Sequence, residues 1–138
     1  MYLIISFILI QFYLKFIKKY PTIFDLSKAS ENEVLKIWQG LGYYTRAVNL
    51  LLTARYISKY RNGIFPDKID ELKKLKGIGD YTASAIASIS YKVPTSVVDG
   101  NVYRLISRFF GLFTPINSSK AYKEFKKRAD NLMANYHP

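Results

Sequence analysis

The 138-residue sequence contains no cysteine, and this absence restricts the chemistry open to it. Without thiols the chain forms no disulfide and offers no thiolate ligand to a metal ion. An iron–sulfur cluster ligated by these residues is excluded for the same reason. We therefore expect no cofactor that is held by this chain itself.

Hydrophobic runs of membrane-spanning length are also missing. The most apolar stretch, Tyr2–Ile10, is soon followed by Gln11 and Lys15, whereas a bilayer span needs about twenty apolar residues. The stretch has neither the basic start nor the small-residue cleavage site of a signal peptide. We expect instead a buried helix that continues to Ile17, with its lysines toward water.

Acidic residues are scarce. Ten Asp and Glu stand against 21 Lys and Arg, which gives a formal net charge of +11 and a pI of about 9.8. This balance on a folded chain predicts a polyanionic partner, of which nucleic acid is the commonest. A membrane surface is the rival partner, and a solvated basic surface without a partner is the third interpretation.

The apolar residues, 49% of the chain, follow a helical spacing. The buried face of a helix over about residues 44–60 would carry Ala47, Leu50, Leu51, Ala54 and Ile57. The only β-prone run, Val93–Val98, has no partner strand. We predict an all-α fold, an orthogonal bundle of about seven short helices in a single domain over residues 1–138.

Local signals mark several helix starts. Ser30 and Glu33 form a capping box before a short helix that ends near Trp38. Asp67 is the expected N-cap of a helix that begins at about residue 68. The last helix is expected to begin at a cap formed by Ser118 or Ser119, and to run through about residue 133.

The stretch around which the chain is organised joins two helical patterns, Lys68–Lys74 and Asp80–Tyr91, by a very short turn. Gly77 and Gly79 bracket Ile78 there, and glycine takes positive φ and lets backbone approach a ligand. The first N–H groups of the second helix would point outward, where a phosphate oxygen can accept them. The pattern predicts a helix-hairpin-helix, and an ordinary helix–helix turn is the alternative.

Asp99 follows shortly after this hairpin, where the apolar run Val97–Val98 gives way to a helix that ends at Gly111. On its own this position indicates an N-cap aspartate. A hairpin followed by a capping aspartate is a far more specific combination than either feature alone.

The stretch Leu75–Arg104 resembles the helix-hairpin-helix DNA glycosylases, whose hairpin is followed by a Gly/Pro-rich loop and an aspartate. Within that superfamily, Gly40–Ala47 and Val98–Val102 look like the adenine DNA glycosylases, which remove adenine mispaired with 8-oxoguanine. The resemblance runs from about Ile10 to the C-terminus. It implies the six-helix module of the glycosylase domain.

Full-length members of this family carry a 4Fe–4S cluster in a lobe with four cysteines, and a C-terminal domain that reads 8-oxoguanine. Neither is expected here, so the resemblance implies a fragment that lacks both ends. It further implies a monomer that binds double-stranded DNA in the bacterial cytoplasm, without a membrane.

The resemblance also assigns catalytic positions. Asp99 matches the carboxylate that stabilises positive charge on the sugar, and a helix N-terminus favours that anion. Asn101 matches a family position that hydrogen-bonds within the site, or is simply a first-turn polar residue. Tyr81 stands where strand-nicking relatives carry a Schiff-base lysine, which a phenol cannot replace. A monofunctional glycosylase is implied, and a thymine-glycol-type endonuclease is disfavoured.

For DNA binding, Leu41 and Tyr43 match the family's wedge, which enters the duplex beside the lesion, with burial in the core as the alternative. The hairpin residues expected to contact DNA are Lys76, Gly77, Ile78, Gly79 and Thr82.

One part of the family's chemistry has no match. The general acid is a glutamate upstream of the residues that align with Met1–Ile5, and no Asp or Glu precedes Asp25 in this chain. Loss of a general acid typically slows a reaction by about a hundred- to ten-thousandfold. We therefore expect a weak or inactive form of the enzyme. A non-catalytic DNA-binding module and a small membrane-associated protein are the alternatives.

Overall fold

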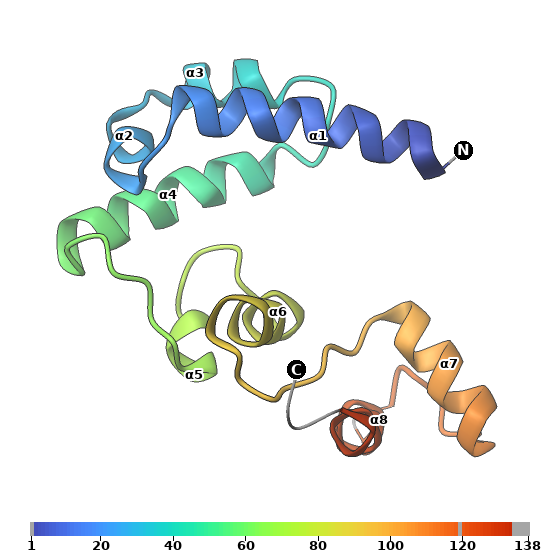
Figure 1. Ribbon diagram of the computed structural model, residues 1–138. Coiled ribbons are helices and arrows are strands. Elements are labelled where there is room, and N and C mark those ends of the chain that lie inside the picture. The colour runs from blue at the N-terminus through green and yellow to red at the C-terminus, as the bar shows by residue number, and fades with distance from the viewer. Residues whose placement is uncertain (1, 119, 134–138) are drawn as a thin grey trace. The chain divides into compact units, whose positions relative to one another are not determined.

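The computed structural model describes residues 2–118 and 120–133, and over these ranges it contains eight helices and no strand (Figure 1). The helices are α1 (Tyr2–Lys19), α2 (Ile23–Lys28), α3 (Glu31–Trp38), α4 (Thr45–Tyr60), α5 (Ile69–Leu72), α6 (Asp80–Tyr91), α7 (Gly100–Phe110) and α8 (Ala121–Leu132). The prediction of an all-α fold is confirmed, with one helix more than expected.

The chain divides into two compact units. Unit 1 takes in the described part of Met1–Phe65 together with Leu75–Gly77, and unit 2 takes in Pro66–Lys74 with the described part of Ile78–Pro138. Each unit has a buried apolar cluster of its own. The expectation of a single domain stays a prediction, and the two units are described separately.

In unit 1, α2 and α3 pack on α4, and α1 packs on α3. Their buried cluster contains Tyr20, Leu26, Ala29, Val34, Ala47, Leu51 and Ala54. Phe16 links α1 to this cluster, because its ring lies edge-on to Tyr20 and Trp38 at centroid distances of 5.3 and 6.2 Å. Aromatic pairs in this arrangement add to the stabilisation from burial.

Capping boxes define the starts of two helices in unit 1. The predicted one before α3 is confirmed: the Glu33 amide donates to the Ser30 hydroxyl, and the Ser30 amide donates to the Glu33 carboxylate. Thr22 and Asp25 form a second box before α2, the helix that the sequence analysis missed. That box gives a six-residue segment enough local stabilisation to be helical after Pro21.

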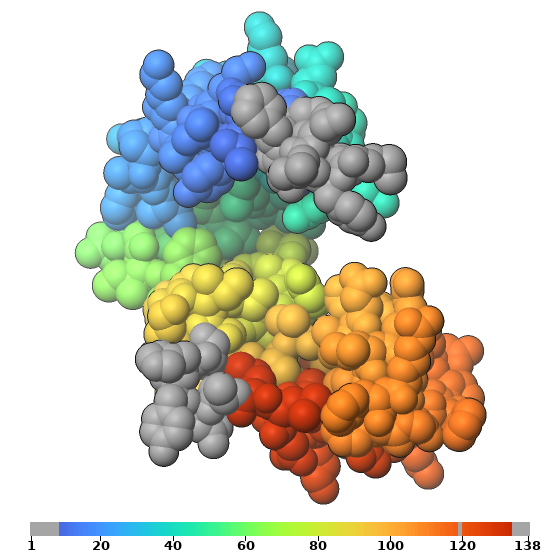
Figure 2. Space-filling view, turned by 45° about the vertical axis from the view of Figure 1, so that its right-hand side comes forward, coloured from blue at the N-terminus to red at the C-terminus, as the bar shows by residue number. Residues whose placement is uncertain are grey.

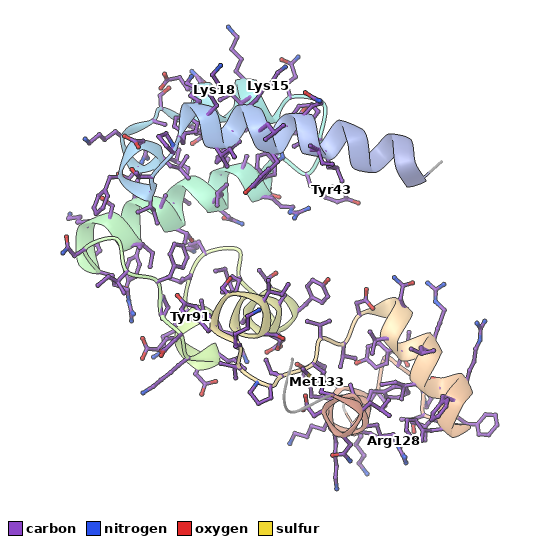
Figure 3. All side chains as sticks on the ribbon, in the orientation of Figure 1. Lys15, Lys18, Tyr43, Tyr91, Arg128 and Met133 are labelled. Atoms are coloured by element: carbon purple, nitrogen blue, oxygen red, sulfur yellow. The ribbon has the colours of Figure 1, made fainter. Side chains whose placement is uncertain are left out.

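The expectation of a buried helix with its lysines toward water is only partly met over residues 9–19, the part of α1 whose side chains the structure describes. Phe12 and Phe16 are half-buried, but Leu9, Tyr13 and Ile17 are exposed. Among the described residues α1 packs closely on α3 alone, so only one side of the helix is covered. Lys15 and Lys18 extend into solvent, as expected (Figure 3). No helix within the described ranges has the length and hydropathy that a bilayer crossing requires.

Leu50 on α4 also departs from the expected core, since 36% of its surface is exposed. It lines an apolar groove of about 270 Å³, together with Leu9, Phe12, Tyr13, Phe16, Ile17, Ile37, Trp38 and Leu41. The other four positions predicted for the buried face of α4 are buried. Helical spacing therefore identified the apolar face correctly, but not how far its edge is covered.

In unit 2, α5 packs on α6 and α7 packs on α8; the latter pair is seen side by side in Figure 2. Phe125 of α8 is fully buried, as is Ile106 of α7. The centroid of the Phe125 ring lies 4.7 Å from that of Tyr103. The helix that ends at Gly111 is confirmed, because Gly111 adopts a left-handed φ of 62° directly after α7.

Two predicted helix starts in unit 2 are wrong. The residue before α5 is Lys68, which makes no side-chain capping bond, and α5 is shorter than expected. The residue before α8 is Lys120, also without a side-chain cap, while Ser118 accepts a bond from Ala121 through its backbone carbonyl. Ser119 lies outside the described residues.

Candidate functional site

The hairpin turn before α6 is fixed by backbone geometry and by a contact with α4. The Thr53 hydroxyl donates a 2.9 Å hydrogen bond to the Lys76 carbonyl oxygen. Gly77 has a φ of 78°, and a Cβ there would lie 2.7 Å from the Cβ of Asn49. Both facts require glycine at this position. The side chain of Lys76 is exposed.

Gly79 differs from Gly77, because its φ of −94° is open to any residue. It is the N-cap of α6 and has no side chain with which to accept the first N–H groups of that helix. A Cβ at Gly79 would meet nothing within 4 Å, so the backbone here is open to an approaching group. Ile78 and Thr82 on either side are half-buried.

An ion pair lies beside this helix start. Asp80, in the first turn of α6, contacts the Lys73 ammonium. The hydrogen bond from Lys73 to Asp80, and then the opposite charge, raise the pKa of the Lys73 ammonium above its usual value. The carboxylate of Asp80 opposes an incoming anion at a helix N-terminus, and Lys73 offsets that repulsion.

The segment that leads to Asp99 is held in place by α8. The Asp130 carboxylate accepts bonds from the Ser96 amide (2.9 Å) and hydroxyl (2.8 Å). The Lys126 ammonium donates to the Thr95 hydroxyl, the Ser96 carbonyl and Asp130, each within 2.8 Å. Burial pushes the pKa of Asp130 upward, but the hydrogen bonds from Lys126 and Ser96 outweigh it and hold the pKa below its usual value.

Asp99 caps α7 in the geometry that the sequence predicts. Its Oδ1 accepts 2.9 Å hydrogen bonds from the backbone amides of Asn101 and Val102. The Asn101 side-chain amide lies 3.4 Å from Asp99 Oδ2, at the outer limit of a hydrogen bond. Asp99 is half-buried and Asn101 is exposed. The structure therefore brings these two predicted residues together at one helix start.

Tyr81 projects from the first turn of α6, and 51% of its surface is exposed. It lines a groove of about 400 Å³ in unit 2 that is mostly apolar. Val97 and Val102, which flank Asp99 in the chain, line the same groove. Tyr81 thus lies beside the segment that carries Asp99.

Leu41 and Tyr43 belong to unit 1, in the loop between α3 and α4. Tyr43 extends from this loop with 81% of its surface exposed, so core burial does not account for it (Figure 3). Its φ of 48° is left-handed, an uncommon conformation for a bulky residue. Leu41 is half-buried in the apolar groove of unit 1.

Sequence reasoning missed three residues that hold these segments. Trp38 donates from its indole Nε1 to the Gly42 carbonyl oxygen at 3.1 Å, and Lys126 with Asp130 holds the approach to Asp99. The four-residue spacing of Lys126 and Asp130 predicts an ion pair on one helix, but not the contact with Ser96. No group of three His, Asp or Glu side chains in the described ranges could hold a metal ion.

A family model for the HhH-GPD superfamily base excision DNA repair proteins matches residues 8–131. The chain belongs to this superfamily. Among curated HhH-GPD relatives, the adenine DNA glycosylase of Buchnera aphidicola subsp. Baizongia pistaciae is 39% identical over 128 residues, which cover 93% of this chain and 36% of the relative. The chain therefore spans about a third of that relative's length.

Two solved HhH-GPD-like structures have the same fold. A thermostable thymine-DNA glycosylase aligns with a TM-score of 0.81 and 28% identity, over 91% of this chain and 58% of that one. A trapped endonuclease III–DNA covalent intermediate aligns with a TM-score of 0.77 and 26% identity, over 91% and 57%. Both similarities agree with the predicted glycosylase fold.

Proposed function

We propose that this chain is part of an adenine DNA glycosylase of base excision repair. Its reaction would be hydrolysis of the N-glycosidic bond of adenine mispaired with 8-oxoguanine or guanine. The observation that carries the proposal is Asp99, a half-buried carboxylate fixed at the start of α7 in a chain 39% identical to a named adenine DNA glycosylase.

The chemistry needs a negative charge close to the sugar. As the bond to the base breaks, the sugar acquires oxocarbenium character, and a carboxylate stabilises that charge. The two α7 amides that donate to Asp99 Oδ1 hold the carboxyl group at the start of α7 and fix its rotamer. Oδ2 keeps acceptor capacity for substrate or water, with Asn101 beside it.

Tyr81 supports hydrolysis by water rather than by an enzyme amine. The solved relative that is a covalent DNA intermediate is an endonuclease III. A covalent intermediate of the Schiff-base kind needs a lysine, and a tyrosine at position 81 cannot provide one. A monofunctional glycosylase therefore fits this chain better than a thymine-glycol-type endonuclease.

Double-stranded DNA is the proposed partner, bound by a monomer. The hairpin turn offers the backbone around Gly77 and Gly79, the exposed Lys76 and the first turn of α6 with Thr82 to phosphate oxygens. The net charge of +11 favours the same partner. Tyr43 would enter the duplex together with Leu41, and its ring would replace lost base stacking.

The chain has no cysteine, so it does not itself ligate a 4Fe–4S cluster of the kind that the resemblance implies for full-length members of the family. We propose that the protein acts on chromosomal DNA in the bacterial cytoplasm.

A second candidate function is DNA binding without catalysis. It is favoured by the hairpin turn, where the open backbone at Gly79 and the exposed Lys76 can hold phosphate oxygens without any reaction at the base.

Adenine release from a duplex with an adenine·8-oxoguanine pair tests the proposal. We expect little release by the 138-residue chain, and a gain when the family's glutamate-containing segment is added upstream. Asp99→Asn should abolish that gain. Substantial release by the 138-residue chain that persists in Asp99→Asn would contradict the assignment of Asp99.

A further inference from the structure

We propose that Trp38 is a positioning residue that sets the conformation of Tyr43, through the hydrogen bond from its indole Nε1 to the Gly42 carbonyl oxygen. The inference rests on the proposed function, because Tyr43 is the side chain assigned there to the DNA duplex.

Tyr43 needs support from its surroundings. Its φ of 48° is left-handed, as are those of Gly42 and Gly40, but only the glycines adopt such values without steric cost. A strained residue of this kind persists only where neighbouring contacts fix it. Burial does not stabilise Tyr43, since most of its ring is exposed. The contacts that fix it must therefore act on the loop backbone.

Trp38 supplies two of these contacts. It is the last residue of α3, and its backbone carbonyl accepts a 3.1 Å bond from the Leu41 amide. Its indole N–H reaches the Gly42 carbonyl, which belongs to the peptide group that joins Gly42 to Tyr43. On the other side, the Tyr43 carbonyl accepts a 2.9 Å bond from the Arg46 amide at the start of α4.

The indole itself is firmly anchored. Its ring packs against the buried cluster of unit 1 and lies edge-on to Phe16. A Cβ built at Gly42 would meet nothing within 4 Å, so packing around Gly42 does not hold the loop at that point. The hydrogen bond from Trp38 thus connects a rigid core to the peptide that orients Tyr43.

The conformation of the loop before DNA binds affects how readily Tyr43 enters the duplex. A loop already in its bound conformation loses less conformational entropy when DNA binds. Trp38 therefore contributes to the entry of Tyr43 without any need to touch DNA itself.

The first test needs no DNA. Trp38 is the only tryptophan, so its indole N–H gives a single side-chain signal in a proton–nitrogen NMR spectrum. We expect its exchange with solvent to be slowed at least about tenfold relative to a free indole, because the bond must break first. Exchange at the rate of free indole would overturn the inference.

The second test measures entry into DNA. The 138-residue chain is bound to a duplex with 2-aminopurine beside an adenine·8-oxoguanine pair, and the change in fluorescence is compared at equal fraction bound. We expect Tyr43→Ala to abolish the change, and Trp38→Phe to weaken it about three- to tenfold, as the loss of one hydrogen bond implies. Tyr44→Ala is the matched control, since Tyr44 is an exposed neighbour with ordinary right-handed backbone.

Trp38→Phe keeps an aromatic ring against Phe16 but leaves a smaller side chain. A benzothiophene analogue of Trp38, which replaces the N–H by sulfur at nearly the same volume, repeats the test if Trp38→Phe unfolds. The double variant Trp38→Phe with Tyr43→Ala should bind the duplex with the same affinity as Tyr43→Ala alone.

The outcomes separate the role of Tyr43 from the role of Trp38. An unchanged signal in Tyr43→Ala would overturn the proposed role of Tyr43. A signal that is lost in Tyr43→Ala but kept in both Trp38 variants would overturn the role of Trp38 alone. A further loss of affinity for the duplex, caused by Trp38→Phe in the Tyr43→Ala background, would also overturn it, because Trp38 would then act through another residue.

Discussion

Asp99 has two functions that substitution can separate. Its Oδ1 caps α7 by accepting the amides of Asn101 and Val102, each at 2.9 Å. Its charge is the feature that the proposed chemistry uses. Asp99→Asn keeps an oxygen in the Oδ1 position and removes the charge, whereas Asp99→Ala removes both.

The two substitutions should therefore lower the free energy of unfolding by different amounts. Replacement of a capping side chain by Ala lowers the free energy of unfolding by about 1 kcal/mol, within a range of roughly 0.5–2. Asn is as good a cap as Asp, so Asp99→Asn should forfeit only the interaction of the charge with the helix dipole, about 0.3–1 kcal/mol. The rate of adenine release in a chain that includes the upstream glutamate should fall at least about a hundredfold in both variants.

Urea denaturation followed by circular dichroism measures the free energy of unfolding. The rate of adenine release is measured on a duplex with an adenine·8-oxoguanine pair. Equal destabilisation by Asp99→Asn and Asp99→Ala would refute the separation of the two functions, because the cap would then depend on charge. The separation is equally refuted if Asp99→Asn retains the rate.

Three further predictions concern other residues. Binding to duplex DNA should weaken steeply with salt, and Lys76→Ala should lower the slope of log affinity against log salt by about one; a flat slope would favour the membrane or protein-partner alternatives. On a duplex with an abasic site, borohydride should trap no covalent adduct with the protein, whereas Tyr81→Lys should gain one; trapping by the unaltered chain that survives Lys76→Ala would contradict the monofunctional assignment. The pKa of Asp130 is lowered on folding, so its contribution to stability is complete above its unfolded pKa of about 4 and is lost as pH falls through the folded value. Asp130→Asn should therefore show a smaller acid-induced loss of stability in urea titrations at pH 3 and pH 6, and an equal loss would rule out this account.

Local signals in the sequence predicted helix ends well. α6 spans Asp80–Tyr91 as the helical spacing predicts, and α7 ends before Gly111, whose left-handed φ ends the helix. Asp67 failed as a cap because such a residue acts only if the chain directs it at the first N–H groups, and the helix starts after Lys68 instead.

Helix and cap signals did not predict the contacts that hold the site segments in place. The bond between Trp38 and Gly42 requires the turn geometry of the loop, and that between Asp130 and Ser96 joins residues 34 positions apart. The exposure of Leu50, Leu9 and Tyr13 depends on what covers an apolar face, which periodicity does not specify. The sequence thus identified the candidate site residues but not the residues that hold them.

The left-handed backbone of Tyr43 implies a conflict between stability and function at this one position. Asn is the side chain that tolerates such a conformation best after glycine, so Tyr43→Asn should relieve about 1 kcal/mol of strain while forfeiting little buried surface. A library of variants screened for heat resistance alone would therefore be enriched in Asn or Gly at position 43. If Tyr43 enters the duplex as proposed, those variants would survive heating better and yet enter DNA less well, a trade-off between stability and function.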